Sequence, residues 1–134
     1  IEYAYTDTRF SDSAPKGNHI PGAIKHVFQA GLNADFSSGW FGSLRLRYFG
    51  ERPLLEDASV ESDASTLLNL RVGYRIGDLT LKADVLNLSD SNDHDIDYYY
   101  ASRLATEPTT IASDDIHYHV IEPRTFRLSV GYAL

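Results

Sequence analysis

The sequence predicts an all-β fold, an antiparallel up-and-down meander of about six strands. Apolar side chains recur at every second position along much of the chain, which is the periodicity of a strand and not of a helix. Two connections between these segments are only a few residues long, whereas the other three are much longer. Short and long connections alternate strictly along the chain, which is the order expected of an up-and-down sheet.

The six expected strands lie near residues 1–10, 23–36, 39–51, 65–76, 78–88 and 122–134. Each carries an apolar side chain at alternate positions, opposed by small, polar or charged residues. In chain order the apolar positions are Ile1, Tyr3 and Tyr5; Phe28, Ala30, Leu32, Ala34 and Phe36; Trp40, Leu44, Leu46 and Tyr48; Leu68, Leu70, Val72, Tyr74 and Ile76; Leu79, Leu81, Ala83 and Val85; and Phe126, Leu128, Val130, Tyr132 and Leu134.

The connections indicate a membrane barrel. Ser37-Ser38-Gly39 and Gly77 lie in tight hairpins, while 11–22, 52–64 and 89–121 are predicted to be long loops. Bacterial outer-membrane barrels have short turns on the periplasmic side and long loops outside the cell. If the chain ends in the periplasm, every short turn lies there and every long loop lies outside. The meander is therefore predicted to be part of a transmembrane β-barrel in the outer membrane of a Gram-negative bacterium, in contact with its lipid.

The polar face of these strands is predicted to face the lumen. It carries arginines in the middle of strands as well as near their ends, namely Arg45, Arg47, Arg71, Arg75 and Arg127. Aromatic residues lie near strand ends on the apolar face, where amphipathic rings settle at lipid interfaces. The alternative is a soluble β domain that binds carbohydrate, with its tyrosines as a platform for the sugar. Such a domain would show the same alternation, but its polar face would be outside and its apolar face inside. An enzyme barrel of the outer membrane is a third reading, although no Ser, His and Asp have a spacing that compels a catalytic triad.

Four segments resemble the barrel strands of TonB-dependent outer-membrane receptors, and they occur in that family's order. The ending Glu122-Pro123-Arg124-Thr125-Phe126-Arg127-Leu128-Ser129-Val130-Gly131-Tyr132-Ala133-Leu134 is similar to the family's last strand, which follows a proline-arginine pair. Asp84-Val85-Leu86-Asn87-Leu88-Ser89-Asp90 resembles the penultimate strand and its exit. Gly42–Leu54 is similar to a third recurrent strand, and Asn18-His19-Ile20-Pro21-Gly22-Ala23 to the loop entering another.

The resemblance implies that residues 1–134 are the C-terminal segment of a receptor barrel whose plug and earlier strands lie outside this sequence. Its function would be the active uptake of a scarce small molecule, such as a ferric siderophore, cobalamin or an oligosaccharide. The absent plug would contact TonB, and the C-terminal strand would be recognised by the barrel-assembly machinery. The family commonly ends in Phe or Trp, whereas this chain ends in Leu134.

The longest connection holds the candidate binding residues. Tyr98, Tyr99, Tyr100 and Arg103 are candidate ligand contacts. The alternative for the three tyrosines is the upper aromatic girdle of the barrel, although three consecutive rings cannot all face lipid. His94, Asp115, His117 and His119 are candidate metal ligands, since imidazole and carboxylate groups bind Zn²⁺ and similar ions. The alternative is a solvated loop whose aspartates form turns.

Composition narrows the remaining classes of function. The net charge is −7, and most of the 19 acidic residues lie in or beside the two longer connections. A nucleic-acid partner is therefore not expected, because such a partner requires a basic surface. No cofactor is expected either, and with no cysteine in the chain thiolate chemistry is excluded.

Overall fold

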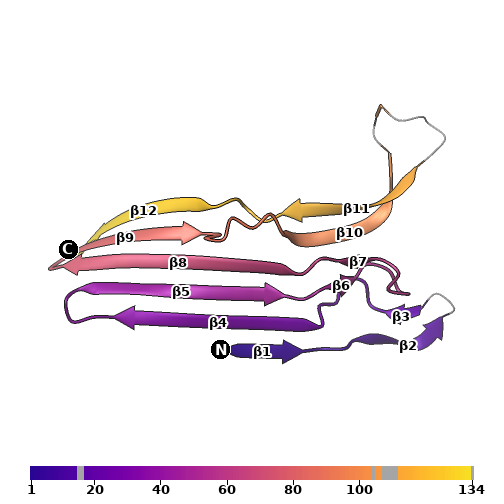
Figure 1. The fold of residues 1–134 in the computed structure, drawn as a ribbon, viewed down its shortest axis with the longest axis horizontal. Coiled ribbons are helices and arrows are strands. Elements are labelled where there is room, and N and C mark those ends of the chain that lie inside the picture. Colours follow the sequence, from indigo (N-terminus) through magenta and orange to yellow (C-terminus); the bar gives the residue numbers. More distant parts are fainter. Residues whose placement is uncertain (15–16, 104, 107–111, 134) are drawn as a thin grey trace.

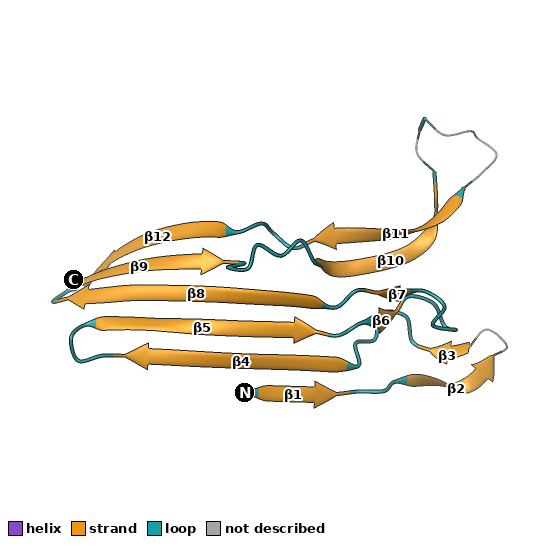
Figure 2. Cartoon of the chain, viewed as in Figure 1, coloured by secondary structure: helices purple, strands orange, loops and turns teal. Residues whose placement is uncertain are grey.

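The computed structural model describes residues 1–14, 17–103, 105–106 and 112–133. Its main feature is one antiparallel sheet of six strands in the order β1 (Glu2–Tyr5), β4 (His26–Asp35), β5 (Trp40–Phe49), β8 (Ser65–Ile76), β9 (Leu79–Leu86) and β12 (Thr125–Tyr132). Figure 1 shows these strands side by side as a single long layer. The predicted six-stranded meander is confirmed. Within the described residues there are strands and loops and no helix (Figure 2).

Tight turns join the strands at one end of the sheet. Gly39 and Gly77 have φ angles of 94° and 54°, a region that glycine enters without the steric penalty of a Cβ atom. The Gly39 amide donates to the Phe36 carbonyl at 3.0 Å, and its carbonyl accepts from Arg75 at 3.0 Å. The predicted hairpins are therefore present. At Gly39 a Cβ atom would also lie 2.5 Å from the Arg75 carbonyl oxygen, so that turn requires glycine.

The long connections at the other end, predicted as long loops, contain strand pairs of their own. β2 (Arg9–Ala14) pairs with β3 (Gly17–His19), and β6 (Arg52–Pro53) pairs with β7 (Glu61–Ser62). β10 (His94–Ser102) pairs with β11 (Ser113–Val120) as a hairpin that curves away from the sheet (Figure 1). Its many charged and histidine residues concealed a strand alternation that only pairing made visible.

Two ends of the predicted strands also require correction. The first was expected to run to residue 10, but β1 ends at Tyr5 and Arg9 belongs to β2. The last was expected from residue 122 and begins at Thr125, because Glu122, Pro123 and Arg124 lie in the connection from β11. Leu134 and Glu107 lie outside the described residues.

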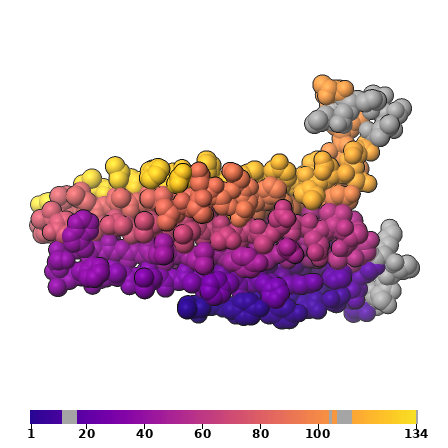
Figure 3. All heavy atoms as spheres, in the orientation of Figure 1, coloured from indigo at the N-terminus to yellow at the C-terminus, as the bar shows by residue number. Residues whose placement is uncertain are grey.

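The sheet has two uncovered faces and almost no core. Among the described residues only Leu54 and Ile121 are buried hydrophobic side chains, and both lie outside the six strands. Large apolar side chains of the sheet are exposed instead, including Leu32, Leu128 and Val130. Figure 3 shows a single elongated slab from which the β10/β11 hairpin projects. A sheet of this kind is stable only when something else covers its apolar face.

No helix in the described part of the chain is both long enough and apolar enough to cross a membrane.

Candidate functional site: the polar face and the outer hairpins

The polar face of the sheet carries ion pairs between neighbouring strands. Arg71 of β8 and Asp84 of β9 are directly opposite each other, and their Nε and Oδ1 atoms are 2.6 Å apart. Asp84 is also directly opposite Arg127 of β12. Asp84 is therefore flanked in the sheet by two arginines and forms an ion pair with one of them.

A second group on this face is packed around a glycine. Phe41 of β5 is opposite Gly73 of β8, and a Cβ atom at Gly73 would overlap the Phe41 ring. Arg75 stacks on the other side of that ring, with its Cζ atom 4.0 Å from the ring centroid. Arg75 also donates two hydrogen bonds to the Asp35 carboxylate, at 2.8 and 3.1 Å. Gly73 thus leaves the space that lets an aromatic ring lie flat on the sheet.

An open hollow of about 410 Å³ lies across β1, β4, β5 and β8 on the polar face, lined among others by Glu2, Gln29, Arg45, Arg47 and Asn69. Arg47 stacks over Phe49 at 4.9 Å. Arg45 has no hydrogen-bonding or ionic partner within the described residues. This hollow therefore presents positive charge and amide groups to whatever faces it.

The five arginines predicted to face a lumen all lie on this one face, as the strand register requires: Arg45, Arg47, Arg71, Arg75 and Arg127. Their common face is established by the pairing. The assignment of that face to a lumen stays a prediction.

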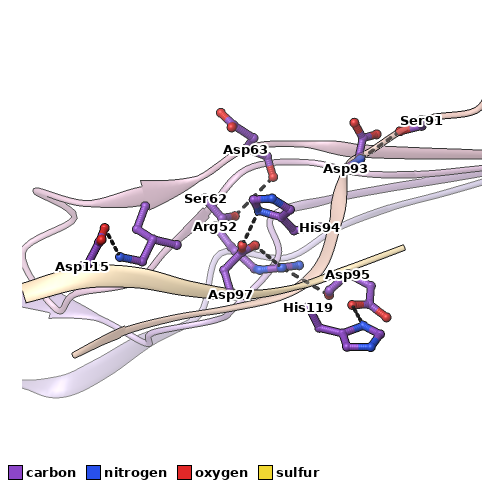
Figure 4. Close-up of polar contacts among 11 residues, drawn as sticks. Arg52, Ser62, Asp63, Ser91, Asp93, His94, Asp95, Asp97, Asp115 and His119 are labelled. Carbon is purple, nitrogen blue, oxygen red and sulfur yellow. Dashed lines mark hydrogen bonds and ion pairs between the residues drawn. The ribbon is translucent and has the colours of Figure 1, made fainter. Parts of the chain in front are cut away.

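At the end of the sheet opposite the tight turns, called the outer end below, a buried ion pair joins two of the hairpins (Figure 4). The Arg52 guanidinium of β6 lies 2.6 Å from the Asp97 carboxylate of β10, and their side chains are 7% and 1% exposed. The second oxygen of Asp97 lies 2.8 Å from Nδ1 of His94. The His94 ring stacks on Tyr118 with centroids 3.7 Å apart. Buried charge is tolerated only when it is paired and hydrogen-bonded, and here both conditions are met.

The same arginine holds a β-bulge in place. The pairing of β10 with β11 shifts between His94 and Ile96, so that Asp95 is the extra residue. Arg52 donates to the Asp95 carbonyl at 3.2 Å. On the side away from Arg52, the Asp95 carboxylate lies 2.9 Å from Nδ1 of His119, as Figure 4 shows. Bulges re-aim side chains in this way.

The three consecutive tyrosines divide between the two faces of the hairpin. Tyr98 and Tyr100 are exposed on the face that also carries His117 and Asp115, their partners on β11. Tyr99 is half-buried on the other face. Tyr100 stacks on His117 with centroids 3.9 Å apart. The sequence-based prediction that the three rings do not all face one way is confirmed. Arg103 follows β10, beside the segment that the structure leaves undescribed.

The four candidate metal ligands are not gathered into one site. His94 is engaged with Asp97 and Tyr118, whereas His117 and His119 lie on the opposite face of the hairpin, where His117 is half-buried and His119 is exposed. The Asp115 carboxylate accepts from the amide of Ile116 at 2.8 Å. Among the residues that the structure describes, no three His, Asp or Glu side chains lie close enough to share a metal ion.

The sequence analysis did not single out Arg52, and it named Asn87 only as part of a segment that resembles a strand of the receptor family. Asn87 follows β9 with a φ of 49° and is 1% exposed. Its Nδ2 donates to the carbonyls of Ser91 and Glu122, at 2.8 and 3.0 Å, and its Oδ1 accepts from the Ser91 amide at 3.0 Å. It ties the exit of β9 to the approach to β12. Asn87-Leu88-Ser89 matches the Asn-X-Ser pattern of a glycosylation acceptor. Because the Asn87 side chain is buried, this position is not accessible for glycosylation.

The comparison with known protein families agrees with this fold. The family described as TonB dependent receptor-like, beta-barrel matches residues 1–88, which include β1 to β9. The chain belongs to this family. Its members are outer-membrane receptors of Gram-negative bacteria that act in TonB-dependent transport, and they are not an enzyme family. No curated protein and no solved structure matches the chain at a significant level.

Proposed function

We propose that this chain is the C-terminal wall of a TonB-dependent transporter that takes up a scarce ligand, of the class of ferric siderophores, cobalamin or oligosaccharides. The plug that contacts TonB and the earlier strands of the barrel lie outside residues 1–134. The observation that carries the proposal is the apolar face of the sheet, which is uncovered and bordered by aromatic rings.

The apolar face has the dimensions of a membrane. Tyr3, Phe28 and Tyr48 are paired across β1, β4 and β5 near the outer end, while Trp40 and Tyr74 are paired near the tight turns. The Trp40 and Tyr74 rings lie 4.8 Å apart. Eight positions separate Trp40 from Tyr48, which is ~27 Å along a strand and about 20 Å across a membrane at a tilt of about 40°.

This spacing is close to the apolar band of outer-membrane barrels, about 25 Å tall with aromatic girdles at both interfaces. Between the two aromatic rows the face carries Leu32, Leu44, Leu70 and Val72, which border an apolar hollow. A soluble sugar-binding domain has no such need of two aromatic borders around an aliphatic band. The transporter reading therefore accounts for more of this face.

The polar face then becomes the lumen wall, with Arg45, Arg47, Arg71, Arg75 and Arg127 inside the barrel. Unpaired guanidinium groups such as Arg45 suit acidic groups of a plug or of a ligand. β12 presents an open hydrogen-bonding edge, which a barrel closes by pairing with another strand. We assign that edge, with its exposed Phe126 and Tyr132, to the first strand of the complete barrel and, during assembly, to the barrel-assembly machinery.

The outer hairpins would form the rim through which the ligand enters. Tyr98 and Tyr100 present exposed rings on β10, and Tyr99 and Arg103 lie beside them. Exposed tyrosines provide a flat, weakly polar surface for stacking on a chelate or sugar. We propose these four residues as ligand contacts.

Cysteine scanning of the full receptor tests the membrane assignment. Residues 1–134 contain no cysteine, so single cysteines at Leu44, Val72 and Leu81 can be spin-labelled once any cysteine in the rest of the receptor has been replaced. In bilayers we expect these labels to be accessible to lipid-soluble oxygen and protected from a water-soluble nickel complex. Labels at the neighbouring positions Ser43 and Arg71, on the opposite face, are the matched controls.

Equal accessibility of adjacent positions to the two quenchers would contradict the membrane assignment.

Transport is tested separately, by cellular accumulation of ⁵⁵Fe-siderophores, ⁵⁷Co-cobalamin and labelled oligosaccharides with and without TonB. Accumulation of at least one probe that requires TonB supports the proposal, and none in cells where the receptor is correctly inserted contradicts it. For that probe we expect Tyr98→Ala/Tyr100→Ala to lower affinity about tenfold or more, and Tyr3→Ala, on the apolar face, to leave it unchanged.

A further inference from the structure

We propose that His117 and His119 form a binding site for a divalent transition-metal ion such as Cu²⁺, Ni²⁺ or Zn²⁺ on the face of the β10/β11 hairpin that also carries Tyr98 and Tyr100. Asp95 is proposed as the residue that positions His119. The site does not depend on which ligand the barrel transports, so it stands or falls separately from the proposed function.

The strand places both imidazoles on one side. His117 and His119 are two positions apart on β11, opposite Tyr98 and Ile96 of β10. Side chains two apart on a strand point to the same face and start ~7 Å from each other. Each imidazole reaches several ångströms from its Cα atom, so two rings at this spacing can converge on one ion with metal–nitrogen bonds of about 2 Å.

His119 already has the second partner that metal-bound histidines usually have. Its Nδ1 lies 2.9 Å from the Asp95 carboxylate, and 69% of its side chain is exposed. A carboxylate that accepts from one ring nitrogen fixes the tautomer and leaves the lone pair on the other nitrogen for a metal. Nε2 of His119 is therefore directed away from the protein and available.

The position of Asp95 is itself fixed from beneath. Asp95 is the bulged residue, and its carbonyl accepts from the buried Arg52, which also pairs with Asp97. No buried side-chain nitrogen or oxygen among the described residues lacks a hydrogen-bond partner. Arg52 thus holds the backbone carbonyl of the bulged residue and the side chain of Asp97, and the bulge directs the Asp95 carboxylate to His119.

His117 is oriented by Tyr100. Their rings stack at 3.9 Å, and Nε2 of His117 lies 3.3 Å from the Tyr100 carbonyl. When Nε2 donates to that carbonyl, the lone pair is on Nδ1. The pair thus offers Nε2 of one ring and Nδ1 of the other. The His117 ring lies toward Tyr100 and the His119 ring toward Asp95, so the His117 ring must turn away from Tyr100 for both to meet one ion.

Two imidazoles define the class of ion. Nitrogen ligands favour Cu²⁺, Ni²⁺ and Zn²⁺ over Mg²⁺ and Ca²⁺, which take oxygen ligands, and Cu²⁺ binds most tightly in this series. Two protein ligands leave the other coordination positions to water or to an external chelator.

The test uses the full-length receptor in detergent micelles, with Cu²⁺ alone as the probe. Electron paramagnetic resonance should show coordination by two imidazole nitrogens. Either His117→Ala or His119→Ala should reduce this to one and weaken binding at least tenfold by calorimetry. Asp95→Asn should keep both nitrogens and lower the affinity about tenfold or more, as for other outer partners of metal-bound histidines.

His26→Ala is the matched control, because His26 is an exposed histidine of the same chain, on the sheet and hydrogen-bonded to Tyr3. It should change neither the spectrum nor the affinity. Retained heat-modifiable migration of each variant on gels shows that the barrel is folded. Equal Cu²⁺ affinity of the receptor and the His117→Ala/His119→Ala variant, or binding only at millimolar Cu²⁺, would overturn the proposal.

Discussion

Single residues in this chain act mainly by fixing the backbone where strands enter and leave the sheet. Asn87 does so with a positive φ angle and a fully hydrogen-bonded side chain. Asparagine tolerates this conformation better than most residues, because its short amide bonds to nearby backbone groups. One side chain therefore links three segments that are far apart in the sequence.

Asn87→Ala should destabilise the folded barrel by about 2–4 kcal/mol, because backbone groups of Ser91 and Glu122 lose their partners and alanine is strained at this φ. Urea unfolding of the receptor in micelles, followed by tryptophan fluorescence, measures the change. Asn33→Ala is the control, since Asn33 is exposed on β4. An effect of Asn87→Ala no larger than that of the control would contradict this role.

Gly73→Ala is expected to cost about 1–3 kcal/mol, the range for overpacking, because the added methyl group overlaps the Phe41 ring on which Arg75 stacks. The same unfolding measurement applies. Gly131→Ala on β12 is the control, because its Cβ atom would meet nothing closer than 4.0 Å. If the two substitutions have equal effects, the packing at Gly73 does not matter to stability.

At the scale of elements, the outer hairpins are held by different kinds of ion pair. Arg52 and Asp97 are buried between β6 and β10. Arg124 and Asp90, in the segments before β12 and after β9, are 42% and 50% exposed with atoms 3.0 Å apart. Removing one partner from a buried pair leaves an uncompensated charge, whereas an exposed pair contributes little. The buried pair should therefore determine whether β10/β11 stays docked.

Asp97→Ala should undock the hairpin, with a local cost of about 3–5 kcal/mol from the buried, unpaired Arg52. Hydrogen exchange of β10 and β11 peptides should rise steeply, while that of β5 and β8 stays unchanged. Arg52→Met/Asp97→Leu should restore part of the protection, because no charge is left buried. Arg124→Met is the matched control and should change protection by less than about 1 kcal/mol. Unchanged exchange in Asp97→Ala would show that other contacts hold the hairpin.

At the scale of the whole molecule, the six-stranded sheet has almost no core of its own. The exposed large apolar side chains of its strands lie on one face, and both edge strands, β1 and β12, have an unpaired side. Exposed apolar surface and open strand edges both promote association in water. In water the isolated sheet is therefore expected to associate through its apolar face and its open edges.

Residues 1–134 expressed alone should associate in detergent-free buffer and should be dispersed, with strand-type circular dichroism, in detergent micelles. Size-exclusion chromatography with light scattering measures this. Leu128→Glu/Val130→Glu, on the exposed edge strand, should reduce association in buffer. If the unmodified chain is a monodisperse monomer that melts cooperatively without detergent, the interpretation of this sheet as part of a larger barrel is contradicted.

The sequence by itself determined the class of this fold, the six strands, the two tight turns and the division of the arginines from the apolar side chains. It could do so because strand alternation is local: each residue's face follows from its neighbours two positions away. Gly39 and Gly77 are equally local signals, since a positive φ depends on the residue itself.

Only the tertiary structure decided how the outer segments are arranged. Arg52 and Asp97 are 45 positions apart, and neither looks different from a surface charge in the sequence. The hairpin β10/β11 was hidden because its strands are rich in charge, and its bulge at Asp95 appears only when the strands are paired. The separation of His94 from His117 and His119 has the same cause. Long-range pairing and burial set which polar groups meet, and no periodicity within the chain encodes them.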